Sequence, residues 1–460
     1  MLAPFCGRDK WQSQGRVLIW DMSAREIRQR AFFDTLQATQ WLPRTELEAY
    51  QRRQLARLLV HAAGTTSFYK QRLAPVFRKD GSMDWSRWHE IPILKRSDML
   101  EHQDEISSND VPRRHGDITV VSTSGSTGIP VQMKWTGLSR MMRRVARWRS
   151  YIWHNFDFSR PYAEVTGIGK WPEGIAKAAW GPPWTKGPMA PLLTMELTTS
   201  VPRLTEWLHR KKAAYFCGPA LLMPAIAQEA AHRKLRLDLA CMIGLGMQPS
   251  VLDREVVAEH LGIPVIEIYS AVDCGQIAHQ CPFGSFHVAS ELVLVEIVDE
   301  HDRACPPGVE GRVLVTVLHG SAQPAIRYDL GDITSFAEPC RCGRSLPVIA
   351  PIVGRSRHMF RFSGDGLFSP TDRQICTMLK PLLQPSWYQL AQTGPRSVEL
   401  RFVSKAPPHK DYQAMLRAGI PAVLRRADLS VAFRQFDSIP TPPGKKHILF
   451  VNEYENPFSG

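Results

Sequence analysis

The sequence predicts an α/β protein: a large, multilayer α/β N-terminal domain with a β-rich segment, followed by a small α+β C-terminal lid domain. Helical stretches alternate with short apolar runs between Arg203 and His260, a pattern typical of a parallel sheet with crossover helices. Between Glu291 and Thr334 the pattern changes to ELVLVEIVD and GRVLVTVL around a turn-rich PPGVEG, which predicts antiparallel strands. We expect a boundary near Gly354, with residues 1–354 in the large domain and 355–460 in the small one.

Local patterns predict the individual elements. Thr45-Glu46-Leu47-Glu48 fits a capping box, and apolar residues then recur at helical spacing, so we expect an amphipathic helix over 45–63. A short strand is expected at 118–121, directly before a Ser/Gly-rich segment. The small domain has its own candidates, namely a helix at Asp372–Leu383 and strands at Ser397–Val403 and Leu429–Phe433.

Composition limits the class of protein and its partners. The chain has 460 residues, 44% hydrophobic, enough for a sizeable core. Its net charge of +13 favours acidic partners such as nucleotides, coenzyme A, an acidic carrier protein, nucleic acid or anionic lipid. The basic residues are scattered, which disfavours a nucleic-acid arm, so we expect no nucleic acid beyond a nucleotide.

No targeting signal for export is visible in the sequence, which bears on where we expect the protein to be. No basic start followed by an apolar run marks a secretory signal, and no apolar stretch approaches the roughly 18–20 residues of a membrane helix. We therefore expect a cytoplasmic protein, if it is bacterial, with no membrane insertion. Nine cysteines in such a chain point away from disulfides and towards a metal or reactive thiols.

The segment STSGSTGIP follows the predicted strand at 118–121. Its glycines let backbone N–H groups approach an anion closely, and its hydroxyls add donors, so it can wrap phosphate oxygens. The GK[ST] ending of the Walker loop is absent, which disfavours ordinary phosphoryl transfer. Taken alone, the segment can also be a flexible Ser/Gly turn. The candidate phosphate contacts are Ser122, Thr123, Ser124, Gly125, Ser126, Thr127 and Gly128.

Four residues form a candidate metal site. Cys281 and His287 precede a strand-rich interval that ends in the Cys340-Arg-Cys342-Gly turn. Three thiolates and one imidazole make a closed tetrahedral set, the ligand pattern of structural zinc. Buried free thiols are the alternative interpretation.

Further segments resemble known motifs in a fixed order. STSGSTGIPVQM resembles the phosphate-gripping loop of the adenylate-forming superfamily, which includes acyl-CoA synthetases, luciferases and peptide-synthetase adenylation domains. The segments similar to its later motifs are IYSAVDCG (268–275), RYDLGD (327–332), GRSRHM (354–359) and PTPPGK (440–445). Within the superfamily, QLARLLVHAAGTTSFYKQRL and IPILKRSDM are most similar to the opening of the phenylacetate–CoA ligase branch.

The resemblance implies an ATP-dependent carboxylic acid–thiol ligase. Such enzymes join a carboxylate to the α-phosphate of ATP, release pyrophosphate, and pass the acyl group to a thiol. Asp332 would accept hydrogen bonds from the ribose hydroxyls and Tyr269 would line the adenine pocket. Asp273 stands where the family usually has glutamate and would help hold Mg²⁺. Because aspartate is one methylene shorter, direct contact and contact through a water both stay open.

The resemblance also implies roles for the C-terminal part of the chain. Lys445 would be the catalytic lysine that neutralises charge during adenylation, with Lys446 as the alternate candidate. Arg355 would reach the ribose or the phosphates. The small domain would rotate between the two half-reactions about residues 357–358. Some members of the branch carry zinc at a comparable Cys/His cluster, and the family suggests a homodimer.

The acid and the acceptor are less constrained by the sequence. An aromatic-rich segment with Trp171, Trp180 and Trp184 occupies roughly the region of the acyl pocket, which favours an aromatic acid, although these tryptophans can equally pack a core. The acceptor thiol can belong to coenzyme A or to the phosphopantetheine arm of an acyl carrier protein. An amide-forming enzyme with an amine acceptor and a catalytically degenerate scaffold are the alternatives.

Overall fold

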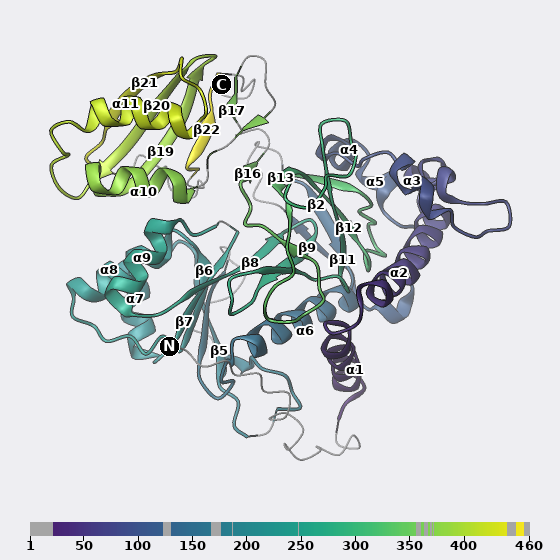
Figure 1. The fold of residues 1–460 in the computed structure, drawn as a ribbon. Helices are drawn as coiled ribbons and strands as arrows, with labels where there is room; N and C mark the ends of the chain where they lie inside the picture. Colours follow the sequence, from purple (N-terminus) through teal and green to yellow (C-terminus); the bar gives the residue numbers. More distant parts are fainter. Residues whose placement is uncertain are drawn as a thin grey trace.

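The protein is described here by a computed structural model, which covers residues 22–122, 130–166, 176–185, 187–246, 248–355, 360–362, 367–368, 370, 372–438 and 448–454 (Figure 1). The helices are α1 (Ala24–Thr39), α2 (Arg44–Thr65), α3 (Ser67–Arg72), α4 (Arg96–Glu101), α5 (Gln103–Ile106), α6 (Gly137–Trp153), α7 (Val201–Arg210), α8 (Leu222–His232), α9 (Val251–Leu261), α10 (Asp372–Leu383) and α11 (Tyr412–Val423). None of the helices in these ranges is both long and apolar enough to cross a membrane.

The helix expected over 45–63 is confirmed as α2, but its expected cap is wrong. The N-cap residue is Pro43, which makes no side-chain hydrogen bond to the first turn, so Thr45 lies inside the helix. The helix begins at Arg44, one residue ahead of the threonine. Its buried face includes the expected stripe of Leu55, Leu58, Leu59 and Ala62.

The largest sheet has a parallel centre, as the alternating pattern predicts. Its strands in spatial order are β14 (Phe336–Ala337), β15 (Val348–Ile349), β10 (Phe286–Val288), β9 (Gly275–Gln280), β8 (Val265–Ala271), β7 (Cys241–Leu245), β6 (Tyr215–Pro219), β3 (Tyr162–Thr166), β5 (Pro191–Glu196) and β4 (Ala176–Ala179). The strands β8, β7, β6, β3 and β5 pair in parallel, and the others pair antiparallel at the two edges.

Helices cover both faces of this sheet. Successive side chains of a strand point to opposite faces, so each strand contributes residues to two cores. Phe216 and Met242 pack into a core with α7, α8 and α9, while Tyr215 and Ile243 pack into the main core with α6. Figure 1 shows α7, α8 and α9 grouped on one side of β6 and β7. The sheet is thus the middle layer of a three-layer α/β arrangement.

The β-rich segment forms a second, antiparallel sheet, as predicted. Its strand order is β11 (Val293–Val298), β12 (Gly311–Val317), β13 (Tyr328–Thr334) and β16 (Gly354–Arg355). Its register sets Asp332 opposite Arg355. A separate two-stranded sheet pairs β1 (Thr119–Ser122) with β2 (Gln132–Trp135). The strand β1 begins one residue later than the strand expected at 118–121.

The C-terminal residues have a hydrophobic core of their own. It contains α10, α11 and a sheet with the strand order β21 (Ser430–Gln435), β20 (Ser397–Ser404), β19 (Pro385–Gly394) and β22 (Phe450–Asn452); a short ladder joins β17 (Phe360–Arg361) to β18 (Leu367–Phe368). The predicted helix and both predicted strands are present, so the α/β fold class with an α+β C-terminal part is confirmed. The exact boundary at 354 stays a prediction.

The C-terminal group lies against α9 (Figure 1). The backbone N–H of Val251, the first residue of α9, donates to the carboxylate of Asp372 over 2.6 Å. Lys380 of α10 forms an ion pair with Glu255 of α9. These contacts join the two cores.

Candidate active site

Tyr269 and Asp332 meet between the two sheets. Tyr269 ends the apolar part of β8, and its hydroxyl donates to Oδ2 of Asp332 in β13 over 2.8 Å. Only 7% of Asp332 is exposed. The tyrosine hydroxyl orients the carboxylate, and a carboxylate has further lone pairs with which it can accept hydrogen bonds from a ligand.

Asp273 and Tyr328 form a second pair of the same kind beside the first. The hydroxyl of Tyr328, the first residue of β13, donates to Oδ2 of Asp273 over 2.8 Å, and both side chains are buried. Burial and the nearby carboxylate raise the pKa of Tyr328 well above its usual value, so the hydroxyl remains a donor at neutral pH. Tyr328 was not singled out from the sequence, although it lies within the RYDLGD segment.

The remaining predicted nucleotide contacts are only partly described. Ser122 is exposed at the end of β1 and stands opposite Gln132 of β2. The backbone of Arg355 pairs with that of Asp332. Thr123, Ser124, Gly125, Ser126, Thr127 and Gly128 lie outside the described residues, as do Lys445 and Lys446.

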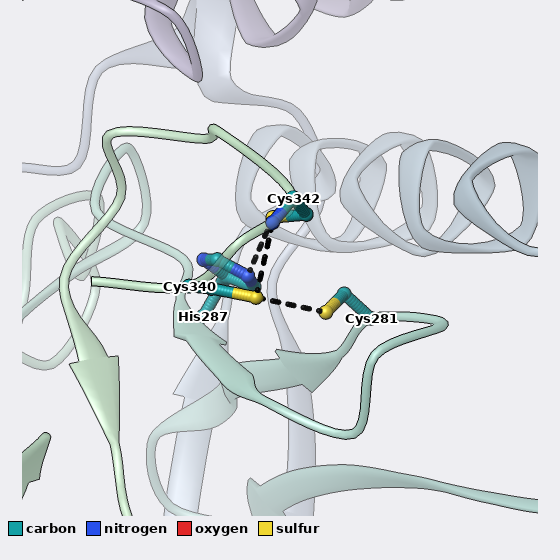
Figure 2. Close-up of side chains that lie close together, drawn as sticks. All are labelled: Cys281, His287, Cys340 and Cys342. Atoms are coloured by element: carbon teal, nitrogen blue, oxygen red, sulfur yellow. Dashed lines mark hydrogen bonds between the residues drawn. The ribbon is translucent and has the colours of Figure 1, made fainter. Parts of the chain in front are cut away.

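The four predicted metal ligands converge, as Figure 2 shows. Their ligand atoms all lie within 4.8 Å of one another, and all but the half-buried Cys342 are buried. Cys281 follows β9, His287 lies in β10, and Cys340 and Cys342 lie in the connection from β14 to β15. The cluster therefore joins two connections at the edge of the large sheet.

The spacing of these atoms fits a tetrahedral metal. Zinc–sulfur bonds of about 2.3 Å at tetrahedral angles put two sulfurs about 3.8 Å apart. The Sγ atoms of Cys281 and Cys340 are 3.7 Å apart, and Cys342 Sγ lies 3.3 Å from His287 Nε2. His287 Nδ1 faces the carbonyl oxygen of Leu346 at 3.4 Å, which leaves Nε2 free to act as the ligand atom.

The cysteines of the cluster differ in protonation: the hydrogen bond to Cys342 and burial raise the pKa of Cys281, so Cys281 is a neutral thiol without a metal. The pKa of Cys342 lies far below its usual value, because its sulfur accepts hydrogen bonds from Cys281 and His287. The Sγ of Cys340 accepts a hydrogen bond from the backbone N–H of Cys342 over 3.4 Å. Thiolates are the form in which cysteine binds metal.

The other described cysteines have no features of activated nucleophiles. Burial raises the pKa values of Cys217, Cys241 and Cys376 to about 12. Burial and the neighbouring Asp273 raise the pKa of Cys274 well above its usual value. These four side chains are therefore neutral thiols at pH 7.

The tryptophans of the expected acyl pocket pack with core residues. Trp180 is buried among aromatic side chains that include Phe158 and Tyr162, with ring centroids 4.6 and 4.9 Å away. Trp184 packs against Phe33 and Trp148. Trp171 lies outside the described residues. The described tryptophans thus add no support for an aromatic pocket wall.

Comparison with known proteins shows which class of protein this chain resembles. No protein-family model matches the chain. A phenylacetate–coenzyme A ligase of Thermus thermophilus is 26% identical over 376 residues, which is 75% of this chain and 78% of the relative. Another, from Aromatoleum evansii, is 31% identical over 139 residues, 29% of this chain and 31% of the relative.

Solved structures agree with the sequence comparison at the level of the fold. A crystal structure of a 2-hydroxyisobutyryl-CoA ligase in its post-adenylation state superposes with a TM-score of 0.68 at 18% identity, covering 89% of this chain and 90% of that one. The protein therefore has the fold of the adenylate-forming enzymes. In sequence it is similar to phenylacetate–CoA ligases, which confirms the resemblance found in the motifs.

Proposed function

We propose that the protein is an ATP-dependent acid–thiol ligase that activates a carboxylic acid as acyl-AMP and transfers the acyl group to coenzyme A. The observation that carries this is the likeness to phenylacetate–CoA ligases across three quarters of the chain. The carboxylates of Asp273 and Asp332 are consistent with this function, since each is oriented by a hydrogen bond from a tyrosine hydroxyl.

In the first half-reaction a carboxylate oxygen attacks the α-phosphate of ATP, and the bond to pyrophosphate breaks. An anion approaches a polyanion, so donors and positive charge must offset the repulsion. Residues 122–128 would grip the β and γ phosphates, Lys445 would neutralise the reacting carboxylate and the bridging oxygen, and Arg355 would contact ribose or phosphate. Tyr269 would position the carboxylate of Asp332 for the ribose hydroxyls and flank the adenine.

Mg²⁺ would neutralise charge on the phosphates when bound. Asp273 is the described carboxylate that fits this role, because Tyr328 donates to its Oδ2 and no described residue donates a hydrogen bond to its Oδ1. Contact through a water would compensate for the short side chain.

We also propose that Cys281, His287, Cys340 and Cys342 hold a structural zinc ion. The set is closed, with three sulfurs and one imidazole, so it leaves no open position for a substrate. The cluster would connect the strand after Asp273 to the segment after Asp332, and so stiffen both parts of the nucleotide site.

The second half-reaction requires a thiol that displaces AMP. The relatives make coenzyme A the first choice, and an acyl carrier protein offers the same phosphopantetheine thiol. Between the half-reactions the C-terminal part, residues 355–460, would turn about residues 357–358. The acid would be aromatic, and the active form a homodimer in the cytoplasm.

Carboxylate-dependent exchange of labelled pyrophosphate into ATP, run over a panel of aromatic and aliphatic acids, tests this function. We expect exchange with at least one acid and thioester formation when coenzyme A is added. Product assays with carrier protein and with amines separate the other acceptors. A well-folded protein that exchanges pyrophosphate with no acid in the panel would contradict the proposal and favour a scaffold.

A further inference from the structure

Arg327 has a backbone conformation that residues with a side chain rarely adopt. Its φ is +50°, in the left-handed region, and it lies directly before Tyr328, the first residue of β13. Among the described residues other than glycine that have a positive φ, Arg327 alone is buried. Such a conformation costs about 1–3 kcal/mol and persists only where the surrounding contacts fix it. Residues of this kind cluster at functional sites, so the contacts of Arg327 bear on the role of Tyr328.

The guanidinium of Arg327 is anchored on two sides. Its Nε donates to Oε1 of Glu296 in β11 over 3.1 Å, and only 2% of the side chain is exposed. Its Nη1 donates to the carbonyl oxygens of His89 and Ile91 over 2.8 and 2.6 Å. The planar guanidinium directs several donors at once, which a lysine ammonium cannot do in the same geometry. The side chain thereby joins β11 to residues 89–94.

The backbone of Arg327 is fixed as well. Its N–H donates to Oγ1 of Thr316 in β12 over 2.9 Å, and its carbonyl oxygen accepts from the N–H of Leu94 over 3.1 Å. The N–H of Asp329 donates to the carbonyl oxygen of Leu94 over 2.9 Å, so Leu94 runs alongside Tyr328. Leu94 lies in IPILKRSDM, one of the segments that resemble the opening of the phenylacetate–CoA ligase branch. This segment therefore holds the start of β13 in place.

We propose that Arg327 is a positioning residue: with residues 89–94 it fixes Tyr328, which orients the carboxylate of Asp273 for ATP and Mg²⁺. This rests on the proposed function and gives residues 89–94 a part in nucleotide binding. The backbone torsions of Arg327 set the direction in which the tyrosine side chain leaves the chain. Its hydroxyl lies 2.8 Å from Oδ2 of Asp273, and a hydrogen bond weakens steeply when its geometry is lost. The alternative is a role in stability alone, which predicts no change in nucleotide affinity.

The test uses the full-length protein, the variants Arg327→Lys and Tyr328→Phe, and the two substitutions combined. Lysine keeps the charge beside Glu296 but loses the second anchor on the carbonyl oxygens. Loss of a hydrogen bond to a charged group corresponds to about a 10-fold or greater change in affinity. We therefore expect each single variant to raise the KM for ATP in pyrophosphate exchange about 10-fold, with the KM for the acid unchanged. The double variant should match Tyr328→Phe, because both substitutions act through one hydroxyl.

Two further variants separate positioning from stability. Thr316→Val removes the acceptor of the Arg327 N–H and leaves the guanidinium contacts in place, so it should also raise the KM for ATP. It provides the test if Arg327→Lys does not fold. Arg312→Met is the matched control, since Arg312 lies in β12 of the same sheet and pairs with Asp302 and Asp329. It should lower the thermal midpoint and leave the KM for ATP unchanged.

An unchanged KM for ATP in folded Arg327→Lys or Thr316→Val would overturn the inference and leave the proposed function intact. So would a double variant in which the two effects multiply, because Arg327 would then act independently of Tyr328. Calorimetry with ATP in excess Mg²⁺ gives the same comparison without turnover. If the wild-type protein binds ATP but exchanges pyrophosphate with no acid, the proposed function fails and the calorimetric Kd values still decide the inference. If it binds no ATP, both fail.

Discussion

Single side chains at the ends of strands carry the candidate chemistry. Asp332 and Asp273 are both nearly buried, and each accepts a hydrogen bond from a tyrosine hydroxyl at 2.8 Å. Such pairing holds each carboxylate in one orientation before a ligand arrives, which lowers the cost of binding.

We expect Asp332→Asn to raise the KM for ATP about 10- to 100-fold, because the amide has no charge and one acceptor oxygen fewer. Initial rates of pyrophosphate exchange at varied ATP measure this. Asp329→Asn is the matched control, since Asp329 lies in the same strand but pairs with Arg312. Equal effects of the two substitutions would show that the loss comes from disturbance of β13.

His319 gives a pH dependence to stability. Its folded pKa of about 4 lies below the unfolded value of about 6.5, because burial disfavours the charged form. Between these two pH values the unfolded chain binds more protons than the folded protein does. The contribution of His319 to the free energy of unfolding is therefore present above about pH 6.5 and is lost as the pH falls towards 4.

The free energy of unfolding falls as the pH is lowered from 7 to 4.5. We expect this fall to be smaller in His319→Gln than in the wild-type protein, by on the order of 2 kcal/mol. Denaturant unfolding at several pH values measures it. His301→Gln, an exposed histidine, should leave the slope unchanged. A slope in His319→Gln equal to that of the wild-type protein would contradict the assignment.

At the scale of elements, the Cys/His cluster lies where the large sheet is weakest. The strands β10, β15 and β14 have only three, two and two residues, so their ladders contain few hydrogen bonds. A metal that joins the turn after β9 to the connection between β14 and β15 would hold these short strands in place.

We expect about one equivalent of zinc per chain, and its loss in Cys340→Ser together with a lower thermal midpoint. The shift should be about 5 °C or more, since each kcal/mol moves the midpoint of a large domain by about 2–4 °C. Metal analysis and calorimetry measure both quantities. Cys305→Ser, a thiol outside the cluster, should keep the zinc. Less than roughly a tenth of an equivalent in the wild-type protein would end the zinc proposal.

Local sequence patterns predicted most of the helices and strands that were named in advance. The parallel centre of the large sheet, the antiparallel β11–β13 and the helix at 372–383 all follow from period and composition. The cap of α2 did not follow, because local capping signals compete with the neighbouring Pro43.

At the scale of the whole molecule, the two cores contact each other where α10 lies against α9. A hydrogen bond and a partly exposed ion pair can break and re-form, which is compatible with a C-terminal part that changes position between half-reactions. The predicted catalytic lysine belongs to that part, so it would contribute to only one of the two steps.

We expect Lys445→Ala to lower acid-dependent pyrophosphate exchange by about 100-fold or more, because a cation at the developing charge is lost. Transfer from supplied acyl-AMP to coenzyme A should be largely retained, and the thermal midpoint unchanged. Lys446→Ala is the control and should exchange pyrophosphate at nearly the wild-type rate. Loss in Lys446→Ala instead would move the role to that neighbour.

The sequence by itself determined the fold class, the order of the motifs and the composition of the Cys/His cluster, because these depend on periodicity and on residue type. Only the tertiary structure decided which hydroxyl orients which carboxylate, how close the four ligand atoms lie, and that Trp180 belongs to a core. Those facts depend on contacts between residues far apart in the chain. Such contacts are set by packing of the sheets and helices, and local sequence patterns do not contain them.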